Sequence, residues 1–578
     1  MQLFCGSNRE YWEARGIMET YDNHNIQEIP LSSPYFRLQV ERFLRANGLR
    51  MEALDAYYTI QNANGDILAG AGLRKDVIKC VAVSPGARSE GLTAPLISHI
   101  LSQHSSTNLK VFTKPENEAI FASLGFHTLG RAPLAILMEN GRELEQYCAY
   151  LKHFRFSGRS GVVLMHANPF TLGHRYLLEQ ALHQVDRLFV ISVQEDLSFF
   201  PYAERMEMIS RGVPDDVVVL NGSPYQISAA TFPTYFLKDL SAAAETQMQL
   251  DLDIFARHIA PALDASVRFV GSEPEDPLTA RYNVLMKERL REVEVVEISR
   301  LEVAGSLLSA SRVRAELQNG ELTAASALCP ETDLPFFLAA MAERALLLEL
   351  DTPLKPGLVG PDSNGAHKDM DYTTMRRGIA ALRPYWSRMA MAASADELQA
   401  LGIEAEEAML AATGGVNTHR GSIFCLGLAI AAANRRTEVT DNEQDIQNRL
   451  VKIARTILYN QLENSELRFT PHSIKDARGM AADGYRVLFE DWLPYLRRDT
   501  SLQKLLLRIM STLDDTCVIH RVGEKRALEV KREAAALLEV FSEGKLQDMC
   551  RNYAAERISP GGAADMLALT IFIDSIIK

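Results

Sequence analysis

The chain has little cysteine, and the cysteine it has is scattered. Seven cysteines occur among 578 residues. No two of them are at CxxC spacing, so neither a disulfide framework nor a zinc cluster is predicted. Long apolar runs are also missing: the longest, residues 423–433, has 11 residues, short of the roughly 18 needed to span a membrane. The N-terminal segment carries charges where a signal peptide has an apolar core. We therefore expect a cytoplasmic protein that does not associate with membranes.

An excess of positive charge is also missing. The chain has 61 Lys and Arg against 74 Asp and Glu, a net charge of −13. This balance excludes a chain-wide basic surface for nucleic acid, although local basic pockets for phosphate groups stay possible. Hydrophobic residues make up 47% and charged residues 23%, as in ordinary globular proteins. At roughly 150 residues per domain, the length predicts three to four domains.

Three regions differ in their hydrophobic pattern. Residues 1–145 mix short strands with helices and include a predicted hairpin around Asn64-Gly65, a dipeptide that favours tight turns. Residues 146–325 alternate apolar strands with helices, which predicts a parallel sheet covered on both faces; the strands are expected at 161–165, 187–193, 217–221, 267–271 and 293–298. Residues 335–578 have helical spacing only, so we expect an all-α domain.

The sharpest signal in the middle region is Thr171-Leu-Gly173-His174, which follows the apolar strand 161–165 and opens a helix. The free N–H groups and the dipole of a helix N-terminus favour anions. Gly173 allows a phosphate to approach the backbone, and His174 is placed to donate to a phosphate oxygen. The alternative is a threonine that caps the helix beside a surface histidine.

A second segment supports the phosphate interpretation. Ser309, Ser311 and Arg314 stand just before a predicted helix, after the last predicted strand. Hydroxyl and guanidinium groups at a helix start form a phosphate cradle. Together the two segments resemble the HIGH-type nucleotidyltransferase superfamily. This resemblance implies a Rossmann-like α/β domain in which a substrate attacks the α-phosphate of a nucleoside triphosphate in line and pyrophosphate is released.

Residues 1–320 more narrowly resemble citrate lyase ligase, through QEDLSFFPYAER, ATFPTYFLK, GSEPEDPLTARYN and SASRVR in this order. The resemblance implies that acetate and ATP form acetyl-adenylate, and that the acetyl group then passes to the prosthetic-group thiol of the acyl carrier (gamma) subunit of citrate lyase. By this resemblance, His174 is catalytic and ATP is bound by Thr171, Gly173, Ser309, Ser311 and Arg314.

The front region, 1–145, resembles an α+β N-acetyltransferase fold. The resemblance rests on NEAIFASLGFHTLG, with Asn117, Phe121 and Gly125 at matching positions. The segment in place of the acyl-CoA pyrophosphate loop begins at Arg88 and lacks that loop's second small residue. We therefore favour a domain for docking or for recognition of the thiol arm over an independent acetyltransferase.

The all-α region contains a loop rich in functional groups, residues 349–371. Carboxylates at positions i and i+2 suit Mg²⁺, and lysine suits the phosphates of a nucleotide. Further polar clusters precede apolar helices at 417–421, 514–521 and 561–565, which suggests one shared pocket between helices. The candidate residues are Glu349, Lys355, Asn364, His367, Lys368, Asp369, Asp371, Asn417, His419, Arg420 and Arg521.

These clusters resemble the triphosphoribosyl-dephospho-CoA synthase family, through KPGLV, NGAHKDMD, TGGVNTHRG, DDTCVIHR and SPGGAADMLA in order over 335–578. The resemblance implies that the 2'-hydroxyl of 3'-dephospho-CoA attacks C1' of the ATP ribose and that adenine is released. Asp369 and Asp371, with Glu349, then bind Mg²⁺ or act as base. The other candidates of this region bind the nucleotides.

The sequence thus predicts a bifunctional enzyme of citrate lyase maturation, a ligase fused to a transferase. Two alternatives remain. The all-α half could serve malonate decarboxylase, whose prosthetic group is the same. One half could instead be an inactive scaffold, since Gly360 and Met480 stand where the synthase family has carboxylates.

Overall fold

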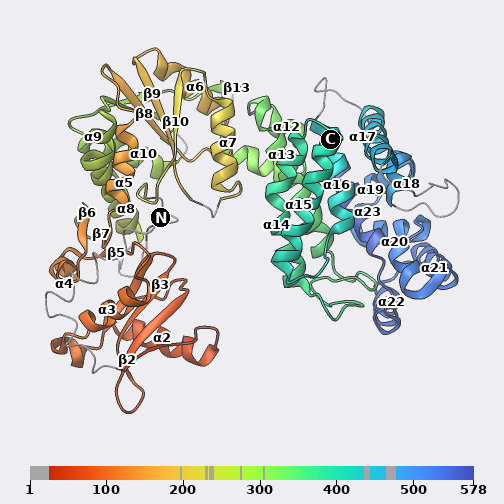
Figure 1. The fold of residues 1–578 in the computed structure, drawn as a ribbon, viewed down its shortest axis with the longest axis horizontal. Coiled ribbons are helices and arrows are strands. Elements are labelled where there is room, and N and C mark those ends of the chain that lie inside the picture. The colour runs from red at the N-terminus through yellow and green to blue at the C-terminus, as the bar shows by residue number, and fades with distance from the viewer. Residues whose placement is uncertain are drawn as a thin grey trace. The chain divides into compact units, whose positions relative to one another are not determined.

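The computed structural model describes residues 25–577 except 196–197, 228–231, 233–239, 274–275, 304–305, 435–442 and 464–476. The chain forms two compact units (Figure 1). The first unit contains the described residues of Met1–Ala167, Gly173–Met206 and Val213–Glu302. The second contains those of Asn168–Leu172, Glu207–Gly212 and Val303–Lys578.

The first unit begins with a seven-stranded sheet of order β1-β2-β3-β4-β5-β7-β6. Within it β4 and β5 pair in parallel, and the other neighbours are antiparallel. The predicted hairpin is confirmed as β2 and β3. The elements are β1 (Ile26–Glu28), α2 (Pro34–Ala46), β2 (Ala56–Gln61), β3 (Ile67–Arg74), β4 (Val77–Val83), α3 (Thr93–Gln103), β5 (Lys110–Thr113), α4 (Glu118–Ser123), β6 (His127–Arg131), β7 (Ile136–Glu139) and α5 (Glu143–Lys152).

The second sheet of this unit has five strands in the order β10-β9-β8-β11-β12, all parallel. The predicted parallel sheet is therefore confirmed, and each expected strand is present. The elements are β8 (Ser160–Met165), α6 (Leu172–Leu182), β9 (Arg187–Ser192), α7 (Tyr202–Gly212), β10 (Val217–Leu220), α8 (Leu240–Ile254), η3 (Phe255–Ile259), α9 (Ala260–Leu263), β11 (Val267–Gly271), α10 (Pro277–Arg289) and β12 (Glu294–Ile298).

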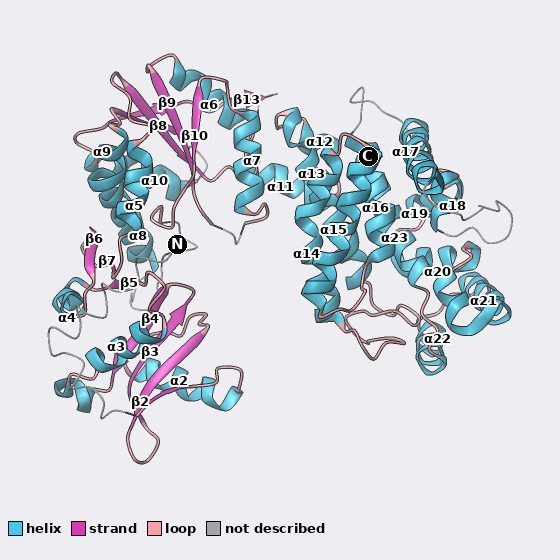
Figure 2. Cartoon of the chain, viewed as in Figure 1, coloured by secondary structure: helices cyan, strands magenta, loops and turns pink. Residues whose placement is uncertain are grey.

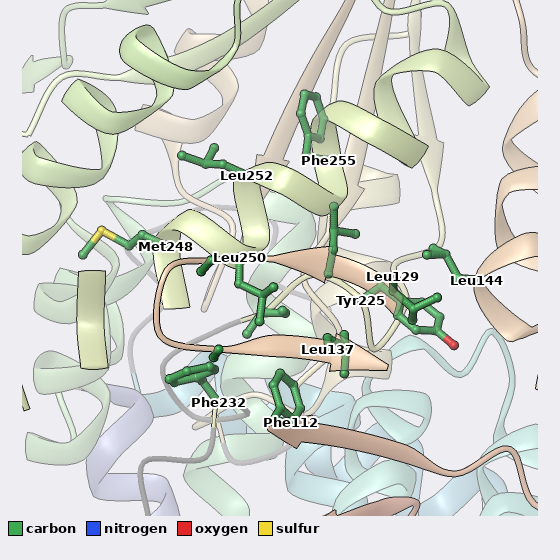
Figure 3. Packing of buried hydrophobic residues seen from close by; sticks show 14 of the residues in the cluster. Phe112, Leu129, Leu137, Leu144, Tyr225, Phe232, Met248, Leu250, Leu252 and Phe255 are labelled. Carbon is green, nitrogen blue, oxygen red and sulfur yellow. The ribbon is translucent and has the colours of Figure 1, made fainter. Parts of the chain in front are cut away.

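One hydrophobic core joins the two sheets. It contains Phe112 and Leu137 from the first sheet and Val162 and Phe189 from the second. Figure 3 shows side chains of helix α8 and η3 in the same cluster as those of β5, β6 and β7. A Cβ added at Gly130 of β6 would lie 2.5 Å from the side chain of a residue in α8, so this helix packs directly on the first sheet.

The second unit is helical apart from the short pair β13 (Glu302–Val303) and β14 (Ser306–Leu307). Figure 2 shows only helices and loops in the described part of the chain after β14, as the helical spacing predicted. The helices are α11 (Ala310–Asn319), α12 (Leu322–Ser326), α13 (Leu334–Asp351), α14 (Tyr372–Met391), α15 (Ala395–Thr413), α16 (Arg420–Asn434), α17 (Glu443–Glu463), α18 (Ala477–Ala482), η5 (Leu488–Trp492), α19 (Leu493–Arg498), α20 (Leu502–Thr512), α21 (Thr516–Glu539), α22 (Glu543–Glu556) and α23 (Gly561–Ile577).

Helix α23 is the centre of this bundle. It packs against α13, α16 and α20, and it is buried around most of its circumference, as expected of a helix that is apolar on every face. Its N-terminus therefore lies among other helices, and this is where the polar residues of the bundle gather. No helix among the described residues is long and apolar enough to cross a membrane.

Candidate functional sites

The first candidate site lies at the carboxyl ends of the parallel strands of the second sheet, the edge at which open α/β sheets bind ligands. His166 follows β8 and Glu195 follows β9, and His166 Nε2 lies 3.1 Å from Glu195 Oε2. The Ser198 hydroxyl lies 3.0 Å from the same nitrogen and donates to Glu195. No role was predicted for these residues from the sequence, since a histidine at a strand end is more often structural than catalytic.

A fully buried guanidinium holds this edge in place. Arg205 of α7 donates to the carbonyl oxygens of His166 and Glu195, both at 2.6 Å, and to that of Val193 at 3.1 Å. These carbonyls follow β8 and β9. A buried charge is tolerated when hydrogen bonds satisfy it, so Arg205 fixes the two strand ends relative to each other.

His174 lies in the first turn of α6, as predicted. Burial, together with the positive charges of Arg300 and His166, lowers the pKa of His174 to about 4. The imidazole is therefore neutral near pH 7 and keeps one N–H to donate. Arg300 follows β12 and pairs with Glu273, which follows β11. His166, which follows β8, and Arg300, which follows β12, are thus both close enough to His174 to affect its pKa.

The segment Asn168–Leu172 and the predicted Ser/Arg motif both lie in the second unit. Ser309 caps α11, accepting from the Arg312 N–H, and its hydroxyl lies 3.1 Å from that of Ser311. Arg314 Nη1 donates to the carbonyl oxygen of Asn168 at 2.6 Å. The motif begins one residue before α11 and continues into it, rather than preceding the helix throughout as we predicted. Arg314 is thus anchored to the loop that contains the buried Thr171.

In the helical unit, Glu349 and Lys355 form a buried ion pair. Glu349 lies near the end of α13, and Lys355 Nζ is 2.5 Å from its Oε1 and 2.7 Å from its backbone oxygen. Burial raises the pKa of Glu349, and the lysine opposes this rise. The next turn requires Gly357, which has a φ of +70°, because a Cβ there would lie 1.9 Å from the carbonyl oxygen of Ile558.

The predicted loop residues divide into two kinds. His367 turns inward: its Nε2 lies 2.8 Å from the Ser559 hydroxyl, and burial and the charge of Arg521 lower its pKa. Asp371 caps α14, accepting from the N–H and the hydroxyl of Thr374 at 2.7 and 2.8 Å, and these bonds lower its pKa. Asp371 is exposed, and so are Asn364, Lys368 and Asp369. Asp369 Oδ1 lies 3.7 Å from His367 Nδ1.

The cluster before α16 has one buried member. His419 is 4% exposed, and its Nε2 has no hydrogen-bond partner. Burial and the charge of Lys355 lower its pKa to about 3, so His419 lies close to the Glu349–Lys355 pair. Asn417 and Arg420 are exposed, and Arg420 pairs with Glu406 of α15.

Two further carboxylates stand at the N-terminus of α23. Asp515 caps α21 and also accepts from the N–H of Ala563 at 2.8 Å. Asp565 accepts from the Ser422 hydroxyl, and burial together with the charges of Asp515 and Glu349 raises its pKa to about 7. The 514–521 and 561–565 clusters are recognisable in the sequence, but no role was predicted for either aspartate.

Among the described residues, no group of three or more His, Cys, Asp or Glu side chains is arranged to hold a metal ion. A Mg²⁺ ion that arrives with a nucleotide needs only one or two carboxylates, since the phosphates supply other ligands. Asp369, exposed beside Lys368, fits that smaller requirement.

Comparison with known proteins divides the chain at residues 335–337. The sequence profile of the citrate lyase ligase C-terminal domain matches residues 160–337, and that of the ATP:dephospho-CoA triphosphoribosyl transferases matches 335–578. The citrate (pro-3S)-lyase ligase of Klebsiella pneumoniae is 41% identical over 317 residues, 52% of this chain and 92% of that protein. The chain belongs to the citrate lyase ligase family.

The second half has relatives of its own. A protein of Azotobacter vinelandii named "Probable 2-(5''-triphosphoribosyl)-3'-dephosphocoenzyme-A synthase" is 34% identical over 288 residues, 44% of this chain and 96% of that protein. The chain therefore belongs to the triphosphoribosyl-dephospho-CoA synthase family as well. Both resemblances inferred from the motifs are confirmed.

Proposed function

We propose that the chain is a bifunctional enzyme of citrate lyase maturation, and the observation that carries this proposal is the near-complete coverage of one relative of each kind by separate halves. The first half joins acetate to the prosthetic-group thiol of the citrate lyase acyl carrier subunit through acetyl-adenylate. The second half makes the precursor of that prosthetic group from ATP and 3'-dephospho-CoA. Service to malonate decarboxylase is less favoured, because the first half matches citrate lyase ligases.

In the ligase half, ATP binds where β8 runs into α6. Thr171, Gly173 and the helix N-terminus face the phosphates, and neutral His174 donates a hydrogen bond to an oxygen on which charge develops. Such preorganised donors are worth about 10²–10³-fold in rate when one is removed. The contact of Arg314 with the carbonyl of Asn168 supports a role for Ser309, Ser311 and Arg314 at the same loop.

The finer fold assignments belong to this proposal. The strand order β10-β9-β8-β11-β12 runs outward from β8 in both directions, as in Rossmann-like sheets, which supports a HIGH-type nucleotidyltransferase domain over 146–325. The mixed sheet over 1–145 supports the acetyltransferase-like fold. There Gly91, with a φ of 68°, ends the turn between β4 and α3 at the position of the acyl-CoA loop, consistent with a domain that recognises the thiol arm.

In the synthase half, over 335–578, the triphosphate of ATP lies at the loop 355–371. Lys368 and Arg521 offer cationic groups, and Asp369 and the remaining oxygen of Asp371 would hold Mg²⁺, which neutralises phosphate charge when bound. Asn364, His367 and Asn417 offer neutral polar groups, and Arg420 adds a further cation. The buried Glu349–Lys355 pair and the buried His419 lie close to one another at the start of this loop.

Two assays on the purified chain test the proposal. Acetate and ATP should give acetate-dependent pyrophosphate and AMP. ATP and 3'-dephospho-CoA should give adenine and a product whose mass equals 3'-dephospho-CoA plus the triphosphoribosyl group. Omission of acetate or of 3'-dephospho-CoA is the matched control. Absence of either product from intact protein contradicts that half of the proposal and favours the inactive scaffold.

A further inference from the structure

A carboxylate that the motif comparison left without a role stands at the start of α23. We propose that Asp565 is the catalytic base of the synthase half, the group that takes the proton from the attacking hydroxyl. This inference rests on the proposed glycosyl transfer and adds to it the residue that performs the proton transfer.

The backbone of α16 is shaped around this carboxylate. A Cβ added at Gly421 would lie 1.9 Å from Asp565 Oδ2, so only glycine allows the helix to approach so closely. The neighbouring Ser422, which is 2% exposed, donates its hydroxyl to Asp565 Oδ1. Asp565 itself is surrounded by protein yet keeps part of its surface open to solvent.

The other carboxylates around Asp565 already have hydrogen-bond or ion-pair partners within the protein. Asp515 accepts from the N–H groups of Cys517, Val518 and Ala563 at 2.9, 3.3 and 2.8 Å, and so joins the starts of α21 and α23. Glu349 is paired with Lys355. Burial and both negative charges favour the protonated form of Asp565, while the Ser422 hydrogen bond favours the ionised form. The balance leaves Asp565 able to exchange a proton near neutral pH, as a general base must.

Two buried polar atoms nearby lack partners. Tyr485 is 1% exposed and its hydroxyl has no hydrogen-bond partner. Burial raises its pKa, and the charges of Cys425 and Asp565 add to this rise, so Asp565 lies near enough to act on the phenol. His419 Nε2, in the turn that leads into Ser422, is likewise unpartnered. Buried polar groups are nearly always hydrogen-bonded, so these two atoms indicate a polar ligand, and the hydroxyl groups of a ribose have the matching chemistry.

The step balances without another reactant. The 2'-hydroxyl oxygen of 3'-dephospho-CoA forms a bond to C1' of the ATP ribose as the bond from C1' to the adenine nitrogen breaks. Asp565 accepts the hydroxyl proton. Adenine leaves with the electron pair of the broken bond and takes up one proton from water, and Asp565 later returns its proton to water. The nearby carboxylates also favour the positive charge that develops on the ribose in the transition state.

The test compares Asp565→Asn and Ser422→Ala with Glu407→Gln, a change at an exposed position of α15. In Asp565→Asn, adenine release should fall by about 10²–10⁴-fold, the range that loss of a general base covers, and acetate-dependent pyrophosphate release should not change. In Ser422→Ala, the rise of kcat/KM with pH should move to higher pH, because a hydrogen bond that favours the ionised carboxylate is lost. Glu407→Gln should behave as the unchanged chain does.

The outcomes of these assays test the assignment of Asp565 separately from the proposed synthase activity. Adenine release by Asp565→Asn at the rate of the unchanged chain overturns the assignment of Asp565, and so does an unshifted pH profile in Ser422→Ala. If Asp565→Asn fails to fold, judged by circular dichroism, the pH profile of Ser422→Ala decides alone. Failure of the unchanged chain to release adenine overturns the proposed synthase activity instead.

Discussion

At the scale of single residues, the clearest consequence of burial is at Asp333. This side chain is fully buried just before α13, and neither of its carboxylate oxygens has a hydrogen-bond partner. Burial raises its pKa to about 8. Between the ordinary pKa of about 4 and this value, the folded chain therefore binds a proton that the unfolded chain has lost.

Stability should consequently fall as pH rises through this window, by up to about 1.4 kcal/mol per pH unit. The Asp333→Asn side chain cannot ionise, so the stability of this variant relative to the unchanged chain should rise with pH. The gain is small at pH 5 and amounts to several kcal/mol at pH 8, an order of magnitude that follows from the same slope. Denaturation midpoints at both pH values measure it. The exposed Asp362→Asn is the control, and a pH-independent difference for Asp333→Asn would contradict the prediction.

The role of a residue could be predicted only where the sequence immediately around it indicates that role. The loop 349–371 was recognisable because its polar residues interrupt apolar helices, and the structure places Glu349, Lys355 and His367 inward. Asp371 shows why such predictions can fail. Its carboxylate caps α14, and an aspartate at this position in the sequence could equally have been a metal ligand. The role of Asp565 could not be predicted from the sequence, because the residues around it come from α13, α16 and α21, which are far apart along the chain.

At the scale of elements, the glycine at the start of α16 is the critical contact. Gly421→Ala would place its Cβ 1.9 Å from Asp565 Oδ2, so the carboxylate or the helix must shift. Overpacking of this kind costs about 1–3 kcal/mol. We expect that loss in stability and at least a tenfold loss of adenine release, measured by denaturation and by assay.

The matched control is Gly402→Ala in α15, where nothing lies within 4 Å of the new Cβ. Alanine in an open helical position should stabilise the chain by about 0.5–1 kcal/mol and leave adenine release unchanged. Equal behaviour of the two variants would mean that the close approach of α16 to Asp565 has no consequence for the site.

Elements were more predictable than contacts between them. The strands of the parallel sheet are short β-branched runs, and β8 to β12 lie where these runs predicted. The helices of the second half follow from their apolar spacing. The single core under both sheets did not follow, because α8 carries no signal that distinguishes packing on the seven-stranded sheet from packing on the five-stranded one.

At the scale of the whole molecule, the division into units does not coincide with the division into functions. The segments Asn168–Leu172 and Glu207–Gly212 associate with the second unit although the chain around them lies in the first. The Leu172 N–H donates to the carbonyl oxygen of Leu328 at 3.0 Å, and Arg314 donates to that of Asn168. Contacts between such distant segments leave no periodic trace in the sequence.

The two chemistries should nevertheless fail separately. His174→Ala removes a donor from the ligase site and touches no residue proposed for the synthase site, so acetate-dependent pyrophosphate release should fall by about 10²-fold or more with adenine release unchanged. Asp369→Ala, at an exposed position, should do the reverse, because the triphosphate loses a carboxylate that would hold its Mg²⁺. Both assays run on the same preparation of each variant. Loss of both activities in either variant would mean that one site depends on the other; full activity of Asp369→Ala would remove that residue from the synthase site.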